Sequence, residues 1–226
     1  MNWILWREYR QHRAILITGA VLLVFPYLVV LLGYASNQLQ GHASNWQTIQ
    51  MAAEMSLMYS QLTLLLFAGS AIAGERADRS AEFLAYLPLA KSWRLAGKLL
   101  VAATLLLIIW GVTLGVAWTL KGPATSALHE TQAGFFVMVA AVGLALFGVA
   151  WLASSLLSSS VYAVLAGLLA PLLLMVLFRG VDTMLFAQQR HHGALLVNVG
   201  FPVTCALVGA SCFVAGTLYF LNRVEP

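Results

Sequence analysis

Apolar and polar stretches alternate along this chain, and each apolar stretch is close to the ~20 residues that a helix needs to cross the hydrocarbon of a bilayer. Six such stretches occur, at residues 14–35, 55–73, 99–120, 133–153, 161–178 and 201–221. The chain is 61% hydrophobic and only 9% charged, whereas an ordinary soluble domain carries about 25% charged residues. The pattern therefore predicts an all-α polytopic membrane protein in which residues 1–226 form one transmembrane domain.

Glycine and cysteine within these stretches suggest helix packing rather than chemistry. Gly134, Gly143 and Gly148 in the fourth stretch are expected to let helices approach closely. Cys205 and Cys212 are seven residues apart in the last stretch, which separates them by roughly 10 Å along a helix. That separation is too large for a disulfide, so we expect two free thiols.

The basic residues predict the orientation of the chain in the membrane. With the N-terminus inside, nine of the twelve Lys and Arg residues lie in inner segments and three lie in outer ones. Because positive residues are retained on the cytoplasmic side, the pattern predicts both termini inside and a multi-pass protein of the cell (inner) membrane. The formal charge of +4 comes from residues clustered beside apolar runs, so nucleic acid is not an expected partner.

Residues 1–13 are basic and aromatic. Read as a helix, they place Leu5, Trp6 and Tyr9 on one side and Arg7, Glu8 and Gln11 on the other. Trp favours the headgroup level and Arg can extend its charge toward water, so we expect an interfacial helix on the inner leaflet. Its expected membrane-surface anchors are Trp3, Trp6, Arg7, Arg10 and Arg13. The alternative is that this segment is the basic flank of the first span.

None of the predicted spans contains Asp, Glu, Lys, Arg or His. Proton- and ion-coupled carriers usually hold an ionisable residue in the membrane, a serine protease would need a base near Ser70, and a haem anchor needs axial ligands in its helices. The adjacent His191 and His192 lie in an outer segment and are interpreted as a solvated loop. We therefore expect no catalytic residue, metal or cofactor on this chain.

Residues 74–98, the charged segment, are the longest charged stretch and lie between the second and third spans. Gly74 is expected to end the second span. Ser80 is a candidate N-cap, Glu82 falls in the first helical turn, and Pro88 stops the helix. Phe83, Leu84 and Leu87 form an apolar stripe on this short helix. The stripe either docks a partner or packs against the segment's own second helix or the ends of the spans.

The charged segment and the six spans together resemble the ABC type-2 permease family. The matching residues are Gly74, Glu75, Glu82, Phe83, Leu84, Leu87, Pro88, Lys91 and Lys98. The resemblance extends to the basic N-terminal segment, the two inner termini and a polar outer segment at 179–200. A typical member has small residues such as Gly-Thr before the acid, where this chain has Arg79-Ser80-Ala81.

The resemblance implies a half-transporter that pairs with a second copy or a related subunit and docks a separate cytoplasmic ABC ATPase. ATP and Mg would bind that ATPase, since this chain has no Gly-x-x-x-x-Gly-Lys-Ser/Thr motif. The docking residues implied are Glu75, Arg79, Ser80, Glu82, Phe83, Leu84, Leu87 and Pro88. We expect Arg76, Arg79, Lys91 and Arg94 to steer or anchor the contact. The alternative is a non-transporting membrane anchor or scaffold for a cytoplasmic complex, and a membrane enzyme is the third interpretation. The residues of the spans do not indicate which substrate would be transported.

Overall fold

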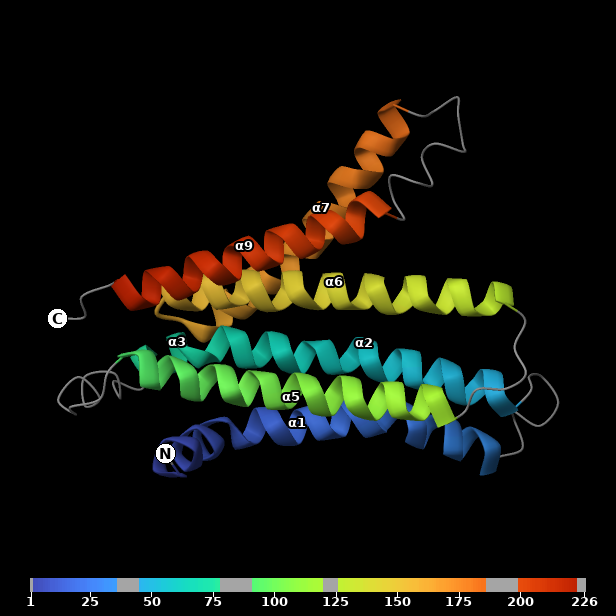
Figure 1. Ribbon diagram of the computed structural model, residues 1–226, viewed down its shortest axis with the longest axis horizontal. Coiled ribbons are helices and arrows are strands. Elements are labelled where there is room, and N and C mark those ends of the chain that lie inside the picture. The colour runs from blue at the N-terminus through green and yellow to red at the C-terminus, as the bar shows by residue number, and fades with distance from the viewer. Residues whose placement is uncertain (1, 36–44, 78–90, 120–125, 186–198, 223–226) are drawn as a thin grey trace. The chain divides into compact units, whose positions relative to one another are not determined.

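The computed structural model describes residues 2–35, 45–77, 91–119, 126–185 and 199–222. These residues form helices and no strand. The helices, labelled in Figure 1, are α1 (Asn2–Ala35), α2 (Asn45–Ala71), α3 (Ala73–Ala77), α5 (Lys91–Thr119), α6 (Ser126–Leu156), α7 (Ser160–Leu185) and α9 (Phe201–Asn222).

Six of these helices are long and apolar enough to cross a membrane. Their candidate spans are Trp6–Gly33, Thr48–Ala71, Ser92–Val116, Gly134–Leu156, Ser160–Val181 and Phe201–Asn222. The predicted all-α fold with six spans is therefore confirmed, and the helices support a multi-pass membrane protein. Several of the helices extend beyond the predicted spans into polar sequence. For example, α1 begins at Asn2 and α5 at Lys91.

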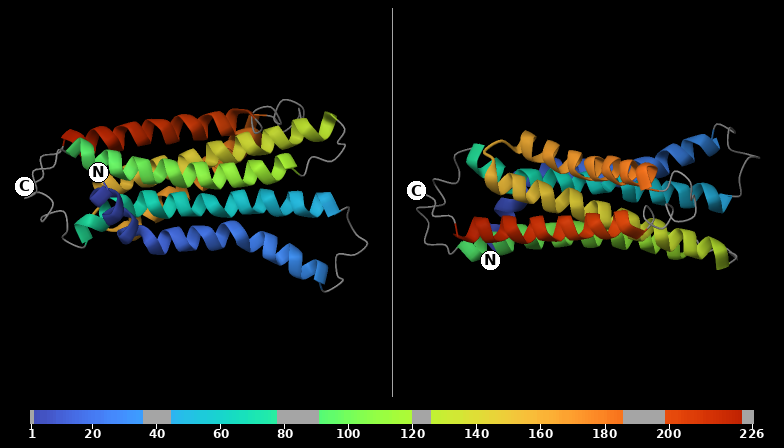
Figure 2. Two further views of the ribbon diagram at one scale, coloured as in Figure 1. Left: turned by 60° about the horizontal axis from the view of Figure 1, so that its bottom comes forward. Right: turned by 90° about the horizontal axis from the view of Figure 1, so that it is seen from above.

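The N-terminal segment is helical and continues into the first span without interruption, since α1 runs from Asn2 to Ala35. A continuous helix is compatible with either interpretation of residues 1–13, an interfacial helix or the basic flank of the first span, and both stay predictions. The left view of Figure 2 shows that the first turns of α1 bend away from the direction of the rest of the helix. The first turns and the rest of α1 therefore run in different directions, although they belong to one helix.

The described residues of Met1–Leu64 and Leu95–Gln132 form one compact unit. In it α1, the first part of α2 and α5 lie side by side (Figures 1 and 2). A Cβ on Gly19 would lie 2.5 Å from Cγ2 of Thr63, so only the hydrogen of glycine fits between α1 and α2. One turn further along, the Ser56 hydroxyl donates to the carbonyl of Leu23 at 2.6 Å. Close backbone approach and an interhelical hydrogen bond are the usual means of holding helices together in lipid.

The described residues of Leu65–Arg94 and Ala133–Pro226 form the second compact unit. It contains the end of α2, α3, α7, α9 and most of α6. Gly148 of α6 faces Gly209 of α9, and a Cβ on Gly148 would collide with the Gly209 carbonyl. The expected close approach at Gly148 is confirmed, whereas Gly134 faces open space among the described residues. Beside this contact, Phe147, Trp151 and Phe213 form an aromatic cluster with ring centroids 5.7–5.9 Å apart.

Candidate functional site

The helices that bound the charged segment are described, whereas its middle is not. Residues 78–90 lie outside the described residues. The predicted short helix therefore lies outside them too, together with the docking residues Arg79, Ser80, Glu82, Phe83, Leu84, Leu87 and Pro88. What the structure describes is how the segment begins, in α3, and how it ends, in α5.

The chain leaves α2 at Ile72 rather than at Gly74, where the sequence predicts the end of the span, and Gly74 lies within α3. The break is held by Ser154 of α6, whose hydroxyl oxygen accepts hydrogen bonds from the amides of Ile72 at 3.1 Å and Ala73 at 2.9 Å. The first amides of a helix have no partner within that helix. Ser154, fully buried, acts as an N-cap for α3 that comes from a different part of the chain.

Arg76 attaches α3 to the same end of α6. Glu75, the one predicted docking residue with a described side chain, is buried. Arg76 donates from Nη1 to the carbonyl of Leu157, the residue after α6, at 3.4 Å. A cation is favourable there because the carbonyls at a helix C-terminus carry partial negative charge. Arg76 therefore secures the start of the charged segment to the end of α6.

Replacing Ser154 with alanine is expected to destabilise the second unit by about 1–3 kcal/mol, because two buried amides lose their acceptor. Ser155→Ala is the matched control, since that neighbouring buried hydroxyl donates within its own helix, to Leu152 at 2.7 Å. Thermal denaturation of the purified protein in a neutral detergent measures both variants. Equal midpoints for the two would contradict the capping role of Ser154.

The charged segment ends at Lys98 of α5, which lies in a buried cluster of ionisable groups. The other two members, Glu8 and His12, belong to α1. The Lys98 Nζ lies 3.6 Å from Glu8 Oε2, and His12 Nε2 lies 3.6 Å from the same oxygen. The exposed fractions are 1% for Glu8, 2% for His12 and 0% for Lys98. Charges held this far from water are stable only when they are paired. The Glu8–His12–Lys98 cluster therefore binds the beginning of α1 to α5.

The Glu8–His12–Lys98 cluster was not predicted from the sequence. The helical pattern placed Glu8 on the polar side of the N-terminal helix with Arg7 and Gln11, whereas the structure buries Glu8 against α5. The spacing of Glu8 and His12, four residues apart, was a visible sign that they share a helix face. Nothing in the sequence indicated that Lys98, distant in the chain, would meet them.

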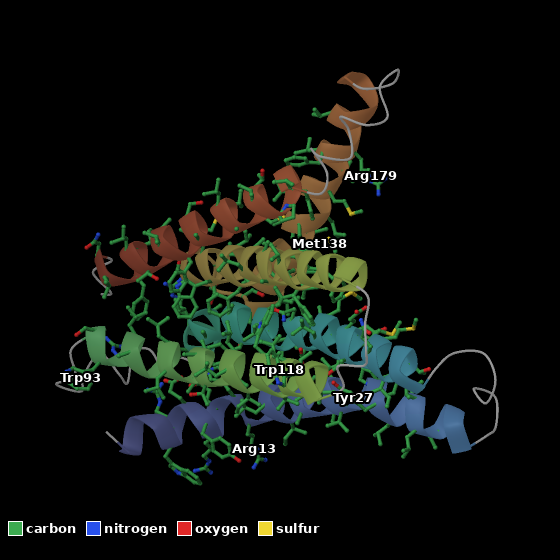
Figure 3. The ribbon with its side chains drawn as sticks, turned by 45° about the vertical axis from the view of Figure 1, so that its right-hand side comes forward. Arg13, Tyr27, Trp93, Trp118, Met138 and Arg179 are labelled. Atoms are coloured by element: carbon green, nitrogen blue, oxygen red, sulfur yellow. The ribbon has the colours of Figure 1, made fainter. Side chains whose placement is uncertain are left out.

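Arg94 is also buried, one turn before Lys98 on α5. Its Nε has no hydrogen-bond partner among the described residues. Burial leaves little of the Arg94 charge at the surface for steering a partner, and its anchoring role stays a prediction. Trp93, beside it, is exposed and is labelled in Figure 3.

The membrane-surface anchors divide into exposed and partly buried residues. Trp6 is 61% exposed and Tyr9 51%, with their rings stacked at a centroid distance of 5.8 Å. Arg10 and Arg13 are exposed, and Arg13 points away from α2 and α5 in Figure 3. Arg7 is partly buried, and the side chain of Trp3 lies outside the described part of the chain.

Metal and disulfide chemistry find no support in the described residues. Within them no three His, Cys, Asp or Glu side chains gather as metal ligands would. His191 and His192 fall outside the described ranges. Cys205 and Cys212 are free thiols, as their spacing predicted.

Comparison of the chain with known proteins returns no match. No protein-family model, curated protein or solved structure matches it. The function is therefore inferred from the residues themselves.

Proposed function

We propose that this chain is the membrane-spanning subunit of an ABC-type exporter and is coupled through residues 74–98 to a separate ATPase. In this proposal both termini and the charged segment lie in the cytoplasm, and the protein resides in the cell membrane. The proposal is supported chiefly by one observation, the attachment of a charged segment between two apolar helices by buried polar contacts at each end. A second copy or a related permease subunit would complete the path for the cargo.

Rigid attachment is what a coupling segment requires. A partner that pushes on residues 80–87 can move the spans only if the segment does not slip at its ends. At its start, Ser154 holds α3 through two buried hydrogen bonds. At its end, Lys98 is paired with Glu8, so α5 would transmit movement to α1 as well. The work would come from ATP and Mg on the partner, with no cofactor on this chain.

The docking helix can be tested by placing charge on its predicted apolar stripe. Phe83→Asp combined with Leu87→Asp is expected to reduce co-purification of the co-expressed ATPase at least tenfold, because two carboxylates cannot enter an apolar cleft without losing their hydration. A P-loop ATPase encoded in a neighbouring reading frame, where the genome holds one, is the candidate for co-expression. Capture by a tag on this chain and ATP hydrolysis by the captured complex are both measured.

The controls separate the exporter from the alternatives. Trp93→Asp changes an exposed aromatic residue outside the predicted stripe and should leave capture of the ATPase unchanged. Membrane insertion of all variants is checked by extraction with detergent. Capture that persists in the double variant would exclude docking through this stripe. Capture without stimulated hydrolysis would indicate a scaffold or anchor rather than a transporter subunit.

A further inference from the structure

One face of α1 is exposed along the helix and carries four aromatic and basic residues near its beginning. Trp6, Tyr9, Arg10 and Arg13 recur at spacings of three and four, which places them on one side of a helix with about 3.6 residues per turn. All four are exposed. The stacking of Trp6 on Tyr9 forms a flat aromatic surface on the helix face that also carries Arg10 and Arg13.

The same face becomes aliphatic within one turn. Exposed residues further along it include Ile17, Val24 and Leu31, with exposed fractions of 63%, 48% and 66%. A surface that changes from arginine and aromatic rings to branched aliphatic side chains matches the boundary between headgroups and hydrocarbon. This change after Arg13 is the pattern expected of a helix whose first turns lie at headgroup depth.

The opposite face of α1 holds its only acid. Glu8 is the single Asp or Glu in the α1 sequence, and it is buried with His12 against Lys98 of α5. Gly19 and the Leu23 carbonyl, on the same side of the helix, contact α2. The pairing with Lys98 thus removes negative charge from the exposed face and leaves Arg10 and Arg13 as its charges.

We propose that the exposed face of α1 from Trp6 to Arg13 binds the headgroups of anionic phospholipids. Two exposed guanidinium groups complement the negative charge of such lipids, and arginine can donate two parallel hydrogen bonds to one phosphate. The continuous aliphatic surface that follows favours a lipid over an acidic protein as the occupant. The proposal requires membrane insertion but does not depend on transport or on an ATPase.

Native mass spectrometry of the full-length protein in a neutral detergent tests this proposal. The protein is mixed with equal amounts of phosphatidylglycerol and phosphatidylcholine that carry identical acyl chains. The wild type is expected to retain the phosphatidylglycerol preferentially. Arg10→Gln with Arg13→Gln should lower that preference roughly fivefold for each arginine removed. Arg10→Lys with Arg13→Lys retains the charge and should retain most of the preference.

Two comparisons make the test specific. Arg179→Gln removes an exposed arginine from α7 (Figure 3) and should leave the preference as in the wild type. Excess inorganic phosphate should not displace the lipid, because free phosphate lacks the acyl chains that the aliphatic face contacts. Equal retention of the two lipids by the wild type would overturn the proposal. So would an unchanged preference in the double glutamine variant, an equal loss in Arg179→Gln, or displacement by phosphate.

Discussion

Replacing Lys98 with methionine is expected to destabilise the first unit by about 3–5 kcal/mol, the cost of leaving a buried charge without its partner. Methionine keeps much of the length and apolar character of the lysine stem, so the main loss is the ammonium group 3.6 Å from Glu8. His12 would remain beside the carboxylate. The midpoint of thermal denaturation in neutral detergent measures the effect.

A second substitution separates lost pairing from lost packing. Adding Glu8→Gln to the Lys98→Met protein removes the carboxylate that has lost its lysine partner. It should restore most of the stability, to within about 1 kcal/mol, since an ion pair can often be replaced by neutral groups. Arg13→Met is the control for removing an exposed cation from the same unit. A double variant as unstable as Lys98→Met would show that packing around Lys98, and not the charge pair, sets the stability.

Replacing Gly148 with leucine is expected to prevent stable folding of the second unit. A Cβ at this position already collides with the backbone of Gly209, and backbone cannot move aside as a flexible side chain can. Overpacking in a fitted core costs about 1–3 kcal/mol, and a collision between two helix backbones should exceed that range. We expect little monodisperse protein after detergent extraction, as judged by size-exclusion chromatography.

The matched control lies in the same helix. A Cβ added to Gly134 would have no atom of the described residues within 4 Å, so Gly134→Leu should be extracted and elute like the wild type. Gly148→Ala should give an intermediate result, because alanine adds only the Cβ. A Gly148→Leu protein that elutes and denatures like Gly134→Leu would refute the close approach of α6 and α9 at this point.

The same contacts define what each end of the charged segment can do. Ser154, Arg76 and Leu157 hold its beginning, and Lys98 with Glu8 holds its end. The Lys98→Met protein could still capture the ATPase but no longer stimulate its hydrolysis of ATP. That result would mean that the Lys98–Glu8 pair transmits movement and does not bind the ATPase. The Phe83 and Leu87 substitutions should act in the opposite way, by abolishing capture itself.

Much of the fold could be predicted because lipid restricts what a chain can form. Backbone groups in hydrocarbon must be hydrogen-bonded internally, so apolar stretches of about 20 residues become helices. For this reason the existence and approximate position of the six spans follow from hydrophobicity alone. The ends of the helices were less predictable, as at Ile72, because the amides there are satisfied by a serine from another helix.

By itself the sequence determined the class of protein, the spans, the charged segment between the second and third of them, and the free thiols. Only the tertiary structure decided that Glu8 and Lys98 are buried together, that Ser154 caps α3, and that Gly148 rather than Gly134 contacts a neighbouring helix. The physical reason is the range of the interactions. Hydrophobicity is a local property of each stretch, whereas pairing and close packing join residues that are far apart in the chain.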